Sequence, residues 1–462
     1  MAQPKDSKFH IAMFPWFAIG HMTPYLHLSN ELAQRGHKIS FLLPNKIRIQ
    51  WEARNLHPNL ITFHPLVVPH IEGLPPGTET DSNIPISLAT HLATAMDLTR
   101  DQVETLLRKL KPDFVFFDSA HWVPELASKI GFLRTVCYTV VSATTLAMQL
   151  VPGRKVFKDM TLMKAEMEKP PSGYPSSTVV LRRHEALAPL IVSTEFGSGI
   201  TLYDRMTTAI RECDALSIRT CQEIEGHFCD YIRSQYRKPV FLTGHVLLEP
   251  TKTEWLLEER WEKWLEGFKP GSVVFCAFGS QLILEKNQFQ ELILGFELTG
   301  LPFFIALKSP TGMTTVEEAL PEGFEERVRG RGVVYGGWVQ QVQILEHRSV
   351  GCFVNHCGLG SMWESLMSNT QIVLVPHLLD QILNTRLMVE ELKVAVEVAR
   401  DEKGWFSKES LCKAINSVMD EDSEVGGLVK KNHVKWKQTL TSPGFMTSYV
   451  DRFIQQLHEL HV

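Results

Sequence analysis

Short apolar runs alternate with amphipathic stretches along the first half of the chain. This alternation is typical of strands joined by helices, and so of βαβ units that form a mostly parallel sheet. Helix-like spacing is clearest at residues 24–35 and 99–110. We expect buried strands at residues 8–14, 38–43, 60–68, 114–118, 135–141, 215–219 and 240–243.

A second alternation occupies the rest of the chain. It predicts strands at residues 272–278, 303–308, 333–335, 350–355, 372–376 and 394–398, and helices at 289–299, 361–369, 381–392 and 408–420. We therefore expect an N-terminal domain at 1–245, a linker at 246–262 and a C-terminal domain at 263–462. The amphipathic spacing of a last helix, at about 446–460, is compatible with packing on either domain.

The fold class that follows is α/β, with two doubly wound parallel-sheet domains facing each other across a cleft. Open sheets of this kind bind ligands at the carboxyl ends of their strands. Polar residues that directly follow a strand are therefore the first candidates for a functional site.

Composition narrows the class of protein. The 462 residues are 44% hydrophobic and 21% charged, a mix typical of a soluble globular protein. A net charge of −5 without a long basic run disfavours a nucleic-acid or anionic-membrane partner. Eight scattered cysteines without a C-x-x-C pair favour reduced thiols. No signal-peptide pattern and no apolar stretch near ~18 residues is present, so we expect a cytoplasmic protein without stable membrane insertion.

The first candidate for chemistry is His21, in a loop-like segment after the first strand. We expect Thr23 and Pro24 to begin the following helix. A histidine titrates near neutral pH and can act as a general base. Asp118 ends the apolar run FVFFD at the same sheet edge, where a carboxylate would orient the imidazole. The alternatives are a histidine that satisfies loop backbone groups and an aspartate that caps a helix.

The second candidate is a strand that runs into a helix at residues 355–361, NHCGLGS. Its glycines expose backbone N–H groups and the helix N-terminus adds a favourable dipole, as in anion sites. His356 is placed to donate to a phosphate as charge grows on a leaving group. A weaker signal is Ser280, in a Gly-Ser turn that follows the first strand expected in the C-terminal domain. The alternative for His356 is a buried histidine in a simple capping turn.

Three further features flank this turn. Trp338 offers a flat face for a uracil ring, although a core tryptophan is the alternative. Glu364, expected on the first turn of a helix from Ser361, suits either a ribose hydroxyl or solvent. Asp380 and Gln381 follow a strand, where they would bind sugar hydroxyls or cap a helix. Together these features predict a nucleotide-sugar donor. No dinucleotide fingerprint, P-loop, zinc spacing or G-x-S-x-G motif is present.

Residues 338–381 resemble the signature segment of the plant secondary-product glycosyltransferases of family 1, which have the GT-B architecture. The matching positions are Trp338, Gln341, His347, Gly351, His356, Cys357, Gly358, Ser361, Glu364, Pro376, Asp380 and Gln381. The resemblance implies that His21 is the catalytic base, that Asp118 is its partner, and that no metal or cofactor is needed. It implies donor-binding roles for Ser280, Trp338, Val339, Gln341, His356, Gly358, Gly360, Ser361, Glu364, Asp380 and Gln381.

Within that family, segments such as FPWFAIGHMTPYLHLSNELA resemble the branch that adds a sugar to a sugar on a flavonoid. This implies a monomer that transfers xylose or glucose, with inversion, from UDP-xylose or UDP-glucose. The implied acceptor is the 2″-hydroxyl of a flavonoid 3-O-glycoside. Leu359 and Gly360 replace the family's usual tryptophan and asparagine, so Gln381 alone does not assign glucose. Direct O-glucosylation of an aglycone, and a catalytically silent UDP-sugar-binding protein, remain alternatives.

Overall fold

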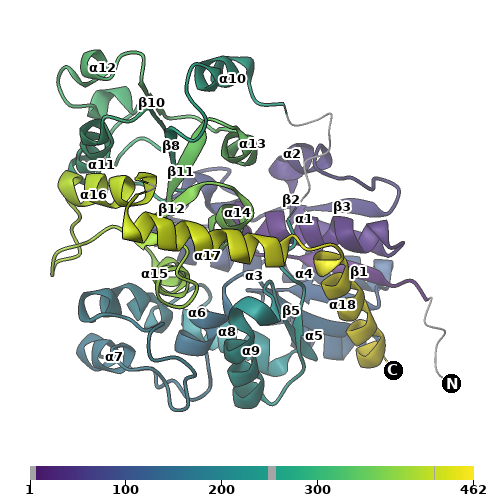
Figure 1. Cartoon of the computed structure of the whole chain (residues 1–462). Helices are drawn as coiled ribbons and strands as arrows, with labels where there is room; N and C mark the ends of the chain where they lie inside the picture. The colour runs from purple at the N-terminus through teal and green to yellow at the C-terminus, as the bar shows by residue number, and fades with distance from the viewer. Residues whose placement is uncertain (1–6, 248–255, 421, 462) are drawn as a thin grey trace. The chain divides into compact units, whose positions relative to one another are not determined.

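The computed structural model describes residues 7–247, 256–420 and 422–461 (Figure 1). Contacts divide the chain into two compact units. Unit 1 comprises Met1–Ser176, Pro189–Leu248 and Gly444–Val462, and unit 2 comprises Ser177–Ala188 and Glu249–Pro443. Each unit contains one parallel sheet, so the predicted α/β fold with two parallel-sheet domains is confirmed.

The sheet of unit 1 has seven strands in the order β3-β2-β1-β4-β5-β6-β7. Every strand pairing in it is parallel. The strands are β1 His10–Phe14, β2 Lys38–Pro44, β3 Ile61–Leu66, β4 Phe114–Phe117, β5 Arg134–Thr139, β6 Ala215–Ile218 and β7 Val240–Leu242. Because β1 pairs with both β2 and β4, Ile11 lies beside Ile39 on one side and Phe114 on the other.

Helices connect these strands in unit 1. They are α1 Ile19–Gln34, α2 Arg48–Glu52, α3 Ala89–Asp97, α4 Arg100–Leu110, α5 Val123–Ile130, α6 Ala143–Gln149, α7 Met160–Met167, α8 Leu202–Glu212, α9 Gln222–Tyr236 and α18 Phe445–His461. Short 3₁₀ turns lie at Asn45–Ile47, Asp81–Asn83 and Ile86–Leu88. An 11-residue 3₁₀ segment at Arg183–Ser193 includes the point along the chain where unit 2 gives way to unit 1.

Unit 2 has six parallel strands in the order β10-β9-β8-β11-β12-β13. They are β8 Val273–Ala277, β9 Phe303–Ala306, β10 Gly332–Tyr335, β11 Val350–Asn355, β12 Gln371–Leu374 and β13 Val396–Glu397. Its helices are α10 Glu259–Glu266, α11 Lys286–Thr299, α12 Phe324–Arg327, α13 Gln341–Glu346, α14 Leu359–Met367, α15 Leu379–Arg386, α16 Lys408–Met419 and α17 Glu424–Leu440, with a 3₁₀ turn at Glu317–Ala319 and a π turn at Leu387–Glu391.

Strand β8 shows why the predicted strands are apolar throughout rather than alternating. Val274 and Cys276 belong to a core that includes residues of α11 and α16. Val273 and Phe275 belong to a second core, with residues of α10 and α13. Successive side chains of a strand point to opposite faces, so a sheet covered on both faces needs apolar residues at every position.

Helix α1 begins earlier than the sequence predicts. It starts at Ile19, and Pro24 lies inside it rather than at its first position. The carbonyl of Ala18 accepts the N–H groups of His21 and Met22, which closes the first turn. A proline inside a helix has no N–H to donate to the carbonyl four residues earlier, here that of Gly20. His21 is therefore a helical residue of the first turn, not a loop residue.

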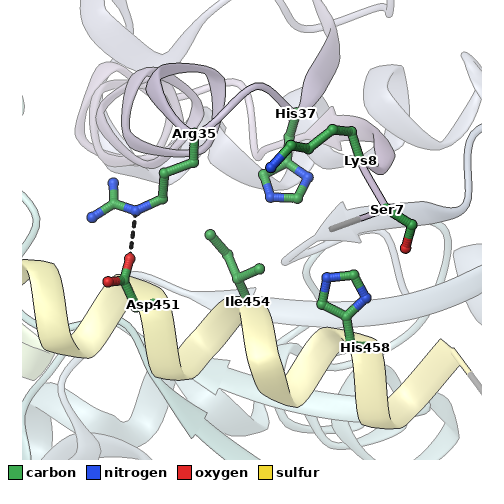
Figure 2. Close-up of a pocket in the computed structure, with 7 residues that line it drawn as sticks. All are labelled: Ser7, Lys8, Arg35, His37, Asp451, Ile454 and His458. Atoms are coloured by element: carbon green, nitrogen blue, oxygen red, sulfur yellow. Dashed lines mark hydrogen bonds and ion pairs between the residues drawn. The ribbon is translucent and has the colours of Figure 1, made fainter. Parts of the chain in front are cut away.

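The last helix, α18, is part of unit 1. Phe453 and Leu457 are buried in the unit 1 core, and the Tyr449 hydroxyl donates to Glu223 at 2.6 Å. Arg35 at the end of α1 pairs with Asp451 at 2.7 Å (Figure 2). Among the described residues, no helix has the length and apolar character that a membrane crossing requires.

A hollow of about 320 Å³ lies beside α18 (Figure 2). It is lined by Ser7, Lys8, Arg35, His37, Asp451, Ile454 and His458. Lys8 and His37 precede β1 and β2 respectively, so the hollow lies at the amino ends of the strands. Ligands of parallel sheets bind at the opposite edge.

Candidate functional sites in the two units

His21 and Asp118 form a hydrogen-bonded pair in unit 1. His21 lies in the first turn of α1, and Asp118 directly follows β4. Strands β1 and β4 are parallel neighbours, so the residues that follow them meet at one edge of the sheet. His21 Nδ1 lies 2.6 Å from Asp118 Oδ2. The two side chains are 26% and 2% exposed, so the imidazole is open to solvent and the carboxylate is not.

The other oxygen of Asp118 is held by backbone donors. Oδ1 accepts the N–H of Trp16 at 2.7 Å and that of Ser119 at 2.6 Å. The next helix, α5, begins only at Val123, so the alternative of a helix-capping aspartate is wrong. A carboxylate bonded to Nδ1–H leaves Nε2 as the proton-accepting atom of the ring, which is the arrangement of an oriented general base.

The turn between β11 and α14 in unit 2 carries a left-handed residue. Cys357 has φ +59°, a conformation that a non-glycine residue rarely adopts. Two asparagines hold it: Asn355 Oδ1 accepts the N–H of Cys357 at 2.8 Å, and Asn384 Nδ2 donates to its carbonyl at 2.9 Å. Asn355 lies within the predicted turn segment, whereas sequence reasoning missed Asn384, because no local pattern relates α15 to this turn.

His356 lies between two glycine turns. A Cβ atom on Gly279 would be 3.0 Å from His356 Cε1, and one on Gly358 would be 2.7 Å from its Nε2. These glycines are therefore required for the ring to fit. Burial lowers the pKa of His356 to about 4, so the imidazole is neutral at physiological pH. A neutral imidazole donates from one nitrogen only.

Helix α14 begins at Leu359, directly after Gly358. The helix N-terminus presents free N–H groups and a favourable dipole for an anion. Gly360 is exposed, with open space where a side chain would lie, whereas the side chain of Ser361 is largely buried. Ser280 follows β8, the parallel neighbour of β11, and so lies at the same carboxyl edge as His356.

Two other predicted residues meet beside this turn. Gln341, the first residue of α13, donates its Nε2 to Glu364 Oε2. Glu364 is the sixth residue of α14, because the helix begins two residues before Ser361. The expectation of a first-turn glutamate is therefore wrong.

Trp338 is 65% exposed, so the alternative of a core tryptophan is wrong. The side chain of Val339 packs in the core beside α10 and α13, which leaves only its main chain for a ligand.

The loop after β12 carries the predicted sugar-reading residues. Gln381 Oε1 accepts the N–H groups of His377 and Leu378, each at 3.0 Å, so the amide caps α15 and its Nε2 is the end left to donate outward. Asp380 is half-buried beside it. His377 is a residue that sequence reasoning missed. Its pKa lies well below the ordinary value because it is buried and faces Arg400, and its ring packs on Phe278.

The described residues contain no group of three or more His, Cys, Asp or Glu side chains that could hold a metal ion. The structure thus has two separate sets of functional groups. Unit 1 has a histidine paired with a buried carboxylate, and unit 2 has a glycine turn that leads into the N-terminus of α14, with an exposed tryptophan and polar side chains among the predicted residues.

Comparison with known proteins shows to which family the chain is similar. Residues 323–438 match the family described as "UDP-glucoronosyl and UDP-glucosyl transferase". The chain is 59% identical over 455 residues to UDP-glycosyltransferase 79B3 of Arabidopsis thaliana, covering 98% of each chain. It is 57% identical to the anthocyanidin 3-O-glucoside 2'''-O-xylosyltransferase of the same plant, covering 99% of this chain and 98% of the relative.

Solved structures agree on the fold. The crystal structure of Arabidopsis thaliana UGT89C1 has a TM-score of 0.75 with this chain at 22% identity, and covers 98% of this chain and 100% of its own. The near-complete coverage at 59% identity, together with the family match at residues 323–438, shows the family. The chain belongs to the plant family 1 UDP-glycosyltransferases, in their 79B group, and is a glycosyltransferase.

Proposed function

We propose that this glycosyltransferase transfers xylose or glucose from its UDP-sugar to the 2″-hydroxyl of a flavonoid 3-O-glycoside, with inversion. The observation that carries the catalytic part is the His21–Asp118 pair at 2.6 Å, with its buried carboxylate and its partly exposed ring. The acceptor class is supported by the 57% identity to a relative named as an anthocyanidin 3-O-glucoside 2'''-O-xylosyltransferase.

In the proposed reaction His21 Nε2 takes the proton of the acceptor hydroxyl. The acceptor oxygen forms a bond to the anomeric carbon from the side opposite UDP. The bond between that carbon and the diphosphate oxygen breaks, and its electron pair leaves with UDP. Asp118 stabilises the imidazolium that results. One displacement from the rear face inverts the anomeric configuration.

Unit 2 supplies the groups for the departing charge. In this proposal the neutral His356 ring donates one N–H to a phosphate oxygen, and the Ser280 hydroxyl and the N–H groups of Gly360 and Ser361 at the start of α14 donate to the same diphosphate. Such donors stabilise charge as it develops on the diphosphate. Trp338 stacks on uracil, and Gln341 holds Glu364 in place for the ribose hydroxyls.

The proposal for the transferred sugar rests on two residues, Asp380 and Gln381. Gln381 Oε1 accepts two N–H groups of the loop backbone, so in this proposal its Nε2 donates to one sugar hydroxyl and the neighbouring Asp380 carboxylate contacts another. Xylose and glucose share the 2-, 3- and 4-hydroxyls that two such groups can bind. They differ in the 6-hydroxymethyl group, which this pair does not need to contact.

The eight cysteines are free thiols, and all but Cys412 are buried. They support the proposal that the enzyme works in the reducing cytosol.

A matrix of substrates tests the proposal. The purified protein is incubated with UDP-xylose, UDP-glucose, UDP-galactose or UDP-rhamnose. Each donor is paired with the 3-O-glucosides of cyanidin and quercetin or with their aglycones, and the products are separated by chromatography. We expect turnover of the 3-O-glucosides with UDP-xylose or UDP-glucose, and a 1→2 linkage by NMR. Transfer to the aglycones alone would instead show direct O-glucosylation, and donor binding without any product would show a catalytically silent protein.

A further inference from the structure

A buried arginine on α8 braces two loops of unit 1. Arg205 is 0% exposed, and each of its five N–H groups has a hydrogen-bond partner. Asp97 at the end of α3 accepts two bonds, of 2.9 and 2.6 Å. The carbonyls of Ser119, Phe196 and Gly197 accept the other three, at 3.1, 2.8 and 3.3 Å.

The first loop is the one that holds the catalytic carboxylate. The N–H of Ser119 donates to Asp118 Oδ1 at 2.6 Å, and the carbonyl of the same residue accepts the bond from Arg205. The guanidinium therefore restrains a residue that itself orients Asp118.

The second loop reaches the same carboxylate from the other side. The ring of Phe196 packs against the ring of Trp16, with centroids 5.5 Å apart. The N–H of Trp16 is the second donor to Asp118 Oδ1, at 2.7 Å. Both backbone donors of Asp118 thus belong to residues that the Arg205 network contacts, one directly and one through the Phe196 ring.

Asp97 completes this network. Its Oδ1 also accepts the indole N–H of Trp122 at 2.9 Å, and its Oδ2 accepts the Ser198 hydroxyl at 2.6 Å. Burial alone would raise the pKa of Asp97, but the bonds and charge of Arg205 outweigh it and the pKa lies below the ordinary value. The carboxylate is therefore charged, and the buried ion pair has the full set of partners that such a pair requires.

We propose that the Arg205–Asp97 ion pair is a positioning device for the His21–Asp118 pair. By fixing the loops on both sides of Asp118, it keeps Oδ2 in line with His21 Nδ1 during proton transfer. The inference rests on the proposed function, in which His21 is the base. Arg205 and Asp97 are positioning residues, since they act through the two loops.

The test compares Arg205→Met and Arg205→Lys with the parent enzyme. We expect kcat to fall by about 10²-fold in both, the loss typical of small displacements of catalytic groups. Lysine keeps the charge but has only three donors in a different geometry, so it does not rescue kcat. The Kd for UDP, measured by calorimetry, stays unchanged because the UDP-binding residues are in unit 2. Should Arg205→Met fail to fold, Asp97→Asn is expected to show the same fall in kcat.

Arg154→Met is the matched control. Arg154 is also buried in unit 1 and donates to the carbonyls of Met148, Glu166 and Lys169, but it contacts neither loop. We expect its kcat to stay within about 2-fold of the parent, even if its Tm falls as far as that of Arg205→Met. An equal loss of kcat in Arg154→Met, or an unchanged kcat in Arg205→Met, would overturn the inference.

A double-mutant cycle with His21→Ala separates this inference from the proposed function. If Arg205 acts through His21, Arg205→Met lowers the residual rate of His21→Ala by less than about 2-fold. An equal fall in both backgrounds contradicts a positioning role. Full activity of His21→Ala contradicts the proposed base and this inference together, whereas an inactive His21→Ala beside a fully active Arg205→Met contradicts the inference alone.

Discussion

At the scale of single residues, Asp118 divides its two oxygens between two tasks. Oδ1 is held by the N–H groups of Trp16 and Ser119, and Oδ2 accepts from His21. The backbone bonds fix the carboxylate before any substrate binds, so the imidazole meets an already oriented partner. Removing the imidazole would remove the proposed base and the donor to Oδ2, while both backbone bonds to Oδ1 would remain.

His21→Ala should lower kcat by about 10²–10⁴-fold, the usual contribution of a general base. The Kd for UDP should be unchanged. Turnover is measured by product chromatography and UDP binding by calorimetry. His70→Ala is the control, because His70 is an exposed histidine of the same unit and should keep full activity. A His21→Ala enzyme as active as this control would contradict the assignment.

In unit 2, Asn384 is a single residue whose removal should affect the turn that contains His356. Asn384→Ala removes the donor to the carbonyl of Cys357, which already has a left-handed backbone. The turn should relax and move His356, so we expect the KM for the UDP-sugar to rise by about 10-fold, as when a supporting hydrogen bond is lost. Steady-state kinetics at varied donor concentration measure this. Asn416→Ala, which removes an exposed asparagine contact to Cys412, should leave the KM unchanged.

At the scale of elements, helices differ in how clearly their sequence predicts them. The 17-residue helix α17 was not predicted, because Gly426 and Gly427 fall near its start and its buried residues form a narrow stripe. Its first turn is stabilised by the Ser423 hydroxyl, which accepts the N–H of Gly426. Helix α18 was predicted, since Tyr449, Val450, Phe453 and Leu457 recur at helical spacing.

The core contacts of α18, and not its ion pair, should hold it to unit 1. Phe453→Ala removes a fully buried ring that packs edge-on against Phe116 and Phe241, and should cost about 3–5 kcal/mol of unfolding free energy. Asp451→Ala breaks the exposed pair with Arg35 and should cost less than about 1 kcal/mol. Urea unfolding at pH 7 measures both, and similar costs for the two variants would refute this account.

At the scale of the whole molecule, the position of a segment along the chain does not determine the unit in which it packs. Ser177–Ala188 belongs to unit 2 although both of its flanks belong to unit 1. A buried ion pair contributes to this: Arg386 on α15 binds Glu185, and also Glu397 at 2.5 Å. Local apolar patterns indicate that a segment is buried but not in which core, so the sequence could not place these residues.

Buried histidines should make the fold sensitive to acid. Burial lowers the pKa of His27 to about 3 and those of His37, His245 and His356 to about 4. In the unfolded chain each binds a proton near pH 6.5. The unfolded state thus binds more protons below that pH. The stability that these neutral histidines contribute is therefore fully present above about pH 6.5 and is lost as the pH falls toward 4.

His37→Asn isolates one of these groups. The amide oxygen can still accept the N–H of Phe9, which His37 Nδ1 accepts at 3.0 Å, but it does not titrate. We expect the Tm to fall less between pH 7 and pH 5 in this variant than in the parent. His70→Asn, at an exposed site, should leave the pH dependence unchanged. Identical slopes in all three proteins would show that His37 does not contribute.

The sequence by itself determined the two sets of strands, the residues that follow them and the family resemblance. Strands buried on both faces must be apolar throughout, and sites of parallel sheets lie where the strands end, so both properties are written locally. His21, Asp118 and the turn containing His356 were found in this way. Trp338 was found as well, but its exposure was open until the structure showed it.

Only the tertiary structure decided which distant residues support these groups. Asn384 reaches Cys357 across 27 positions and Arg205 reaches Ser119 across 86, and no spacing in the sequence predicts either bond. The start of α1, the capping role of Gln381 and the unit to which α18 belongs were settled in the same way. Each depends on hydrogen bonds or burial against residues remote in sequence, and such contacts exist only once the chain has folded.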